Sequence, residues 1–172
     1  GIDFKASQRP AGPYVEIDSS YTATESATFP VPMTTPTIFA IDFGTSNSLL
    51  AAASSEETFP PVPLDDEASD ATVLRTALFF TRLSAGGTFG AAAIRAFVEN
   101  GFRGRLIRSI KRHLPSRSFT KTRVGDQFVA LEDLIGAFLK AMRERACKHF
   151  GVDVRRVVMG RPALFSSDPE CD

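Results

Sequence analysis

The feature that most constrains the fold is the stretch 131–150, in which apolar side chains recur at spacings of three and four residues. They are Leu131, Leu134, Ile135, Phe138, Leu139, Met142, Ala146 and Phe150. This spacing places them on one face of a helix. Glu132 and Asp133 in the first turn and Lys148 in the last complement the helix dipole, and Gly151 is a typical C-terminal stop. The stretch therefore predicts a long amphipathic helix that needs an apolar surface to pack against.

Apolar runs on both sides of this helix predict that surface. Residues 37–43 are rich in β-branched and aromatic side chains and predict a buried strand, and residues 48–53 predict a second strand after a turn at 44–47. Residues 154–159 predict a further buried strand directly after the helix. A strand that follows a long helix indicates a crossover onto the first sheet, so we expect an α/β (or α+β) class.

The remaining pattern is weaker. Residues 1–36 are rich in Pro, Ser, Thr and Ala and predict a flexible N-terminal tail. Further expectations are a proline-containing edge strand at 59–64, an acidic loop at 65–70, a strand at 73–82, a turn at 84–87, and helices at 91–100 and 105–114.

Composition excludes several classes. Twenty Lys and Arg balance twenty Asp and Glu, which disfavours a globally basic nucleic-acid binder, and no apolar run approaches the roughly 18 residues of a membrane span. Cys147 and Cys171 cannot form a disulfide framework, so we expect a reducing, cytoplasmic location. The two histidines give little support to a His-based triad.

The segment Asp42-Phe43-Gly44-Thr45-Ser46-Asn47-Ser48 is the sharpest chemical feature. Glycine lets the backbone approach a ligand closely, and successive turn amides can form an anion-binding concavity. Asp42 is suited to a hydrated divalent cation, because Mg²⁺ takes only one or two carboxylates. The same pattern is also typical of an ordinary hairpin turn in which Asp42 bonds local amides. No Walker loop or Gly-x-Gly-x-x-Gly is present, so a nucleotide would bind through a hairpin.

The segment 38–48 resembles the first phosphate motif of the DnaK-type heat-shock chaperones, members of the actin-like ATPase superfamily. Four further segments resemble this family in the same order: Leu74-Arg75-Thr76-Ala77-Leu78-Phe79-Phe80, Phe89-Gly90-Ala91-Ala92-Ala93, Ser109-Ile110-Lys111-Arg112-His113-Leu114, and 157–165 with its Gly160-Arg161-Pro162. The Gly-Arg-Pro version is closest to the YegD-like bacterial branch.

The resemblance implies an incomplete first lobe of an actin-like (ribonuclease-H-like) ATPase fold from residue 37 onward, with 59–123 as a small capping subdomain. It implies ATP or ADP with Mg²⁺ as ligands, and β- and γ-phosphate contacts from Gly44, Thr45, Ser46 and Asn47. It implies that Asp42 binds Mg²⁺ through water, that Lys111 is catalytic at the γ-phosphate, and that Pro162 is a conformational switch. From the residues alone, Lys111 is also one base in a basic run, and Pro162 a strand terminator.

Some family features differ or have no counterpart. Asn47 stands where Tyr is common, and Met159-Gly160-Arg161 replaces the usual Thr-Val before the proline. The second phosphate motif, the catalytic carboxylate, the adenosine motif and the peptide-binding domain have no counterpart. We therefore expect an N-terminal fragment of a chaperone that couples ATP hydrolysis to binding of unfolded protein clients and co-chaperones, and no measurable ATPase in this chain alone. The alternatives are a fragment of a sugar or acetate kinase, and a non-catalytic scaffold on the same fold.

Two charged segments complete the sequence. Residues 103–123 contain eight Lys or Arg and no acid. With only Phe119 as an aromatic neighbour, an amphipathic helix with a solvated basic face is favoured over a nucleic-acid surface. Asp65-Asp66-Glu67 is a carboxylate cluster, which in a polar loop is more often plain surface than a metal or acid/base site.

Overall fold

The computed structural model describes residues 3–4, 17–18, 34–82, 87–116 and 118–160. Within these ranges the chain is mixed α/β. The strands are β1 (Asp3–Phe4), β2 (Ile17–Asp18), β3 (Ile38–Phe43), β4 (Asn47–Ala53), β5 (Leu74–Arg75), β6 (Ala77–Phe80), β7 (Gly87–Phe89), β8 (Arg105–Arg108), β9 (Lys121–Val124), β10 (Gln127–Ala130) and β11 (Val157–Met159). The helices are α1 (Ala91–Glu99), the 3₁₀ helix η1 (Ile110–His113) and α2 (Leu131–Phe150).

The main sheet has the strand order β11-β3-β4-β5. Strands β3 and β4 form the predicted antiparallel hairpin, with Phe43 opposite Ser48 beside the turn. After α2 the chain returns to the same sheet, where β11 pairs in parallel with β3. The predicted crossover is therefore confirmed, although β11 begins at Val157 instead of residue 154. The prediction that this strand is buried is wrong, because all three residues of β11 are exposed at the edge of the sheet.

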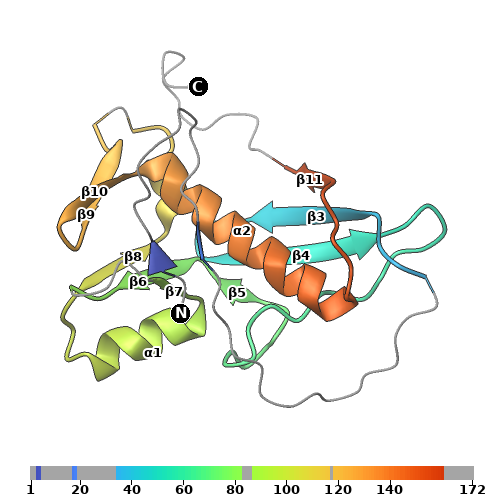
Figure 1. The fold of residues 1–172 in the computed structure, drawn as a ribbon, viewed down its shortest axis with the longest axis horizontal. Coiled ribbons are helices and arrows are strands. Elements are labelled where there is room, and N and C mark those ends of the chain that lie inside the picture. The colour runs from blue at the N-terminus through green and yellow to red at the C-terminus, as the bar shows by residue number, and fades with distance from the viewer. Residues whose placement is uncertain (1–2, 5–16, 19–33, 83–86, 117, 161–172) are drawn as a thin grey trace.

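Helix α2 lies across one face of this sheet (Figure 1). Phe138 of α2 lies 5.9 Å from Phe43 between ring centroids, and Phe150 lies 6.2 Å from Phe39. The long helix has the predicted bounds, and Gly151 ends it in the left-handed conformation with φ of 68°. Buried and exposed residues alternate along β3, because every second side chain points to α2. Asp42 consequently lies on the exposed face.

A second sheet, of order β7-β6-β8, carries α1. The predicted strand 73–82 divides at Thr76: β5 pairs with β4 in the main sheet, and β6 pairs with β7 and β8 in the second. Thr76 is therefore the point at which the chain passes from one sheet to the other.

The predicted helix 105–114 is wrong. Residues 105–108 instead form β8, antiparallel to β6, with Arg108 opposite Ala77. Ile107 is buried in the main core, whereas Leu106 packs against the smaller cluster near α1, so two neighbouring residues face opposite sides as in a strand. Ser109 then adopts a left-handed conformation with φ of 55°, and η1 follows.

Residues 59–64 do not form a strand either, although they run beside β4. Two backbone hydrogen bonds join the segments, from Phe59 N to Ala52 O at 2.9 Å and from Val62 N to Leu50 O at 3.2 Å. Prolines at 60, 61 and 63 have no N–H to donate, so a regular ladder cannot form.

Some predictions fall on residues that the structure does not describe. They include most of the tail 1–36, residues 84–86 of the predicted turn, and Pro162. Among the described residues, neither α-helix combines the length and apolar character needed to cross a bilayer.

Candidate functional site

The turn between β3 and β4 is unusually tight and depends on Gly44. A Cβ placed on Gly44 would lie 2.0 Å from the backbone oxygen of Asn47, far inside van der Waals contact. The glycine is therefore required because two backbone segments of the turn approach each other. This reason differs from the approach to a ligand for which the sequence predicted it.

A closed ring of three hydrogen bonds holds this turn. Gly44 N donates to Ser48 Oγ at 3.3 Å, and Thr76 Oγ1 donates to Gly44 O at 2.9 Å. The two hydroxyl oxygens are 2.9 Å apart. Since the Thr76 proton is used on Gly44 O, the Ser48 hydroxyl is the donor between them. Both side chains are buried, so the ring satisfies groups that would otherwise be unpaired.

Thr76 also connects the turn to the segment that carries Lys111. Its backbone N donates to Ser46 O at 2.9 Å, and its backbone O accepts from Ser109 N at 3.3 Å. Ser109 directly precedes η1, so the position of η1 is tied to the turn through one residue. Sequence reasoning assigned no role to Thr76 or to the Ser48 hydroxyl, because their partners lie about thirty residues away in sequence.

Lys111 reaches the turn from η1. Its Nζ donates to Phe43 O at 2.6 Å across a sequence separation of 68 residues. The ammonium also lies 5.9 Å from the centroid of the Phe43 ring. A lysine ammonium has three donors, so two remain for another acceptor. The structure thus brings together the predicted catalytic lysine and the predicted phosphate-binding turn.

Several polar groups of the turn have no partner among the described residues. The backbone amides of Thr45 and Ser46 donate no intramolecular hydrogen bond there, and the Asp42 carboxylate accepts none. Ser46 and Asn47 are exposed. The alternative in which Asp42 bonds local amides is therefore not what the described part of the chain contains.

Asp42 and Lys111 are not in contact. Asp42 points to the exposed face of β3, whereas the Lys111 ammonium lies against the Phe43 ring, and Phe43 faces α2. No group of three His, Cys, Asp or Glu side chains able to hold a metal occurs in the part of the chain that the structure describes. The residues present fit a cation that keeps most of its water and is held by one carboxylate and a ligand's phosphates, as Mg²⁺ often is.

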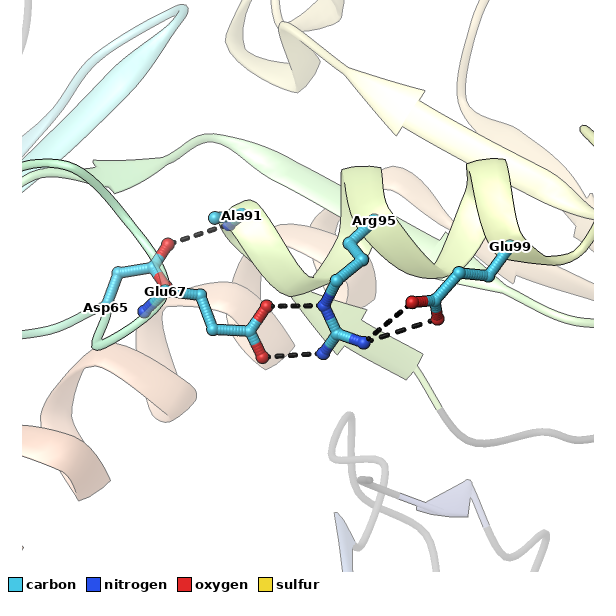
Figure 2. A network of polar contacts seen from close by, with 5 residues as sticks. All are labelled: Asp65, Glu67, Ala91, Arg95 and Glu99. Atoms are coloured by element: carbon cyan, nitrogen blue, oxygen red, sulfur yellow. Dashed lines mark hydrogen bonds and ion pairs between the residues drawn. The ribbon is translucent and has the colours of Figure 1, made fainter.

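The acidic cluster at 65–67 is structural, and the expectation of plain surface is wrong for Asp65. Asp65 is 4% exposed, and its Oδ2 accepts from Ala91 N at 2.7 Å, at the start of α1. Glu67 forms two hydrogen bonds with Arg95 of α1, at 2.6 and 2.8 Å, and Arg95 also contacts Glu99 (Figure 2). The hydrogen bond from Arg95 holds the pKa of Glu67 below its ordinary value.

Comparison with known proteins does not assign this chain to a family. No protein-family model and no curated protein sequence matches this chain. The roles of the turn, Asp42 and Lys111 therefore stay predictions that rest on the residues and their geometry.

Proposed function

We propose that the turn 44–47 and Lys111 bind the phosphates of a nucleotide, in the N-terminal part of a DnaK-type ATPase domain. The strand order β11-β3-β4-β5, with α2 before the parallel strand, is compatible with the actin-like, ribonuclease-H-like lobe that the sequence resembles. The small sheet with α1 lies within residues 59–123, the range expected for the capping subdomain, although β5 of that range belongs to the main sheet.

The observation that carries the proposal is the bond from Lys111 Nζ to Phe43 O. Lys111 and the glycine turn were both given these roles through the resemblance to the chaperone family, and they lie in different elements. Phe43 directly precedes Gly44, so this contact brings the Lys111 ammonium to the start of the turn. Their meeting supports a common ligand.

The chemistry follows from the groups left open. The amides of Thr45 and Ser46 and the two remaining Lys111 donors would hold phosphate oxygens. A lysine charge at this place also stabilises negative charge that develops in phosphoryl transfer. ATP would supply the transferable phosphoryl group, and Asp42 would bind the water shell of its Mg²⁺ ion. In the whole protein we propose ATP hydrolysis coupled to binding of unfolded proteins and co-chaperones, with Pro162 as the switch.

Thermal unfolding with and without Mg-ADP tests the phosphate site. A ligand that binds only the native state stabilises it by about 2.7 kcal/mol at one hundred times its Kd, so the melting temperature should rise with ADP concentration. Lys111→Met should remove most of this rise. Arg112→Met is the matched control, because Arg112 is the exposed neighbour on the same 3₁₀ helix.

The outcomes separate the roles of the residues. Asp42→Asn should leave the effect of ADP without Mg²⁺ unchanged and reduce only the additional effect of Mg²⁺. The proposal fails if saturating Mg-ADP does not raise the melting temperature of the unmodified chain, or if Lys111→Met and Arg112→Met respond alike.

A further inference from the structure

The β9–β10 hairpin presents one basic, aromatic face to solvent. Phe128 lies directly opposite Arg123, and Ala130 lies opposite Lys121. Paired residues in an antiparallel ladder share a face, and so do residues two apart along a strand. Lys121, Arg123 and Phe128 therefore lie on the same side, while Thr122 and Val124 are buried on the other. Figure 1 shows the hairpin at one end of the molecule, beside the start of α2.

Phe128 is the most exposed of the large apolar side chains that the structure describes, at 68%. The Lys121 ammonium lies over one face of this ring, 5.2 Å from its centroid, so a flat ligand would stack on the other face. An exposed ring in this setting is a poor site for an apolar protein surface, since the neighbouring ammonium and guanidinium groups would lose water on docking. It suits a flat ligand that is itself attached to negative charge.

A hollow of about 610 Å³ adjoins the hairpin and is lined mainly by polar and basic side chains. They include Arg82, Arg105, Arg123, Thr122 and Asp126. Arg105 donates to Thr122 Oγ1 at 2.8 Å, and Arg123 pairs with Asp126 at 3.0 Å. Three arginines against one aspartate give the hollow a charge of about +2 at neutral pH. Arg82 has no ion pair among the described residues. Arg123 belongs both to this hollow and to the hairpin face.

We propose that the hairpin face and the adjoining hollow bind single-stranded nucleic acid. One base would stack on Phe128, and the flanking phosphates would contact Lys121, Arg123 and the arginines of the hollow. Stacking on an aromatic ring next to a basic groove is how proteins hold single strands without sequence preference. A duplex keeps its bases paired and stacked, so it could use only the basic groups. An acidic peptide carries negative charge but has no regular series of aromatic bases that could stack on Phe128.

This surface takes Arg105, Lys121 and Arg123 from the basic stretch that the sequence analysis considered and adds an aromatic ring to them. The basic stretch 103–123 has only Phe119 as an aromatic, and Phe119 stacks on His113 with a centroid distance of 4.2 Å. Phe128 lies outside that stretch and joins it only through the pairing of β9 with β10. The proposal is independent of the nucleotide site at Lys111.

Fluorescence anisotropy with a labelled oligothymidylate of about 12 nucleotides, at low salt, tests the proposal. Phe128→Ala should weaken binding about tenfold, the loss typical of one stacked base. Arg123→Gln should weaken binding and lower the slope of log affinity against log salt by about 0.7, as expected for one lost phosphate contact on a single strand. Asp126→Asn should strengthen binding, because it removes the acid from the hollow.

Val158→Ala and Arg156→Gln are the controls, since both residues are exposed near β11 in the main sheet. Neither variant should change binding. Circular dichroism melting of each variant checks that the fold is retained. A duplex of the same length and a labelled poly-glutamate peptide should bind at least tenfold more weakly than the single strand, by the stacking contribution.

The proposal is overturned if the oligonucleotide does not bind, or if Phe128→Ala binds as well as the unmodified chain. It is also overturned if duplex or poly-glutamate binds equally well, because the face then recognises negative charge alone.

Discussion

The acidic loop 65–67 and the glycine turn 44–47 both carry polar residues that the sequence presents as candidate sites. The structure shows that these polar groups have different partners in the two regions. At the acidic loop, Asp65 accepts from the first amide of α1 and Glu67 is paired with Arg95, so both carboxylates are occupied by the protein itself (Figure 2). At the glycine turn, the ring of Gly44, Ser48 and Thr76 fixes the backbone. The amides of Thr45 and Ser46 have no partner among the described residues.

The difference shows which polar clusters can bind a ligand. A loop in which Asp65 and Glu67 are already paired within the protein stabilises the fold and offers those carboxylates to no ligand. In the glycine turn, hydrogen bonds fix the backbone while two amide donors have no partner among the described residues. Such a turn is preorganised for an anion, because binding requires little reorganisation. Substitutions in the acidic loop should therefore change mainly the free energy of unfolding. Substitutions in the glycine turn should change both the free energy of unfolding and the binding of a ligand.

The largest effect should come from Gly44→Ala. The new Cβ meets Asn47 O at 2.0 Å, so the turn must open. We expect a loss of about 3 kcal/mol or more in the free energy of unfolding, measured by urea denaturation. Gly136→Ala is the matched control on α2, where nothing lies within 4 Å, and it should stabilise by about 0.5–1 kcal/mol. Equal behaviour of the two variants would contradict the tight turn.

Asp65→Ala should cause the second-largest loss in the free energy of unfolding. It removes a buried acceptor and leaves Ala91 N without its partner, which should cost about 2 kcal/mol of unfolding free energy. Urea denaturation measures the loss, and Asp66→Ala, at the exposed neighbour, should change it little. The rise in melting temperature with Mg-ADP should persist in Asp65→Ala. If that rise disappears, the acidic loop contributes to the ligand site and the contrast between the two regions fails.

Thr76→Val should cost about 1–2 kcal/mol, because Gly44 O loses its donor and Ser48 loses its acceptor. It should also weaken the effect of Mg-ADP, since Thr76 holds both the turn and the approach to η1. Thr88→Val is the control, as the buried Thr88 hydroxyl has no partner among the described residues, so its removal should be neutral or stabilising. A loss of stability with an unchanged ADP response would limit Thr76 to a structural role.

Glu67→Gln should have the smallest effect, because the pair with Arg95 is exposed. The folded-state pKa of Glu67 is lowered, so its contribution is complete above the ordinary value of 4.5 and is lost as pH falls through the lowered value. We expect a decrease of about 2 °C or less in melting temperature at neutral pH, and a smaller decrease as the pH is lowered below the ordinary value. A difference that grows on acidification would contradict this sign.

Much of the fold follows from local pattern. The bounds of α2, of β3 and of the turn at Gly44 are set by neighbouring residues, and each was predicted close to where it is observed. Local pattern singled out the turn and Asp42, whereas the role of Lys111 came from the resemblance to the chaperone family. The distance between Lys111 and Phe43 could not be predicted, because the two residues are 68 positions apart and meet only in the tertiary structure.

The sequence by itself determined the elements that a local pattern of apolar residues defines, namely the hairpin, the long helix and the returning strand. The tertiary structure decided the conformation of residues 105–108, the burial of Asp65, the ring around Gly44, and the joining of Phe128 to a basic face. In each of these cases the deciding partner is distant in sequence or lies on a neighbouring strand. Such partners act through pairing and burial, which outweigh the small intrinsic preferences of a short segment.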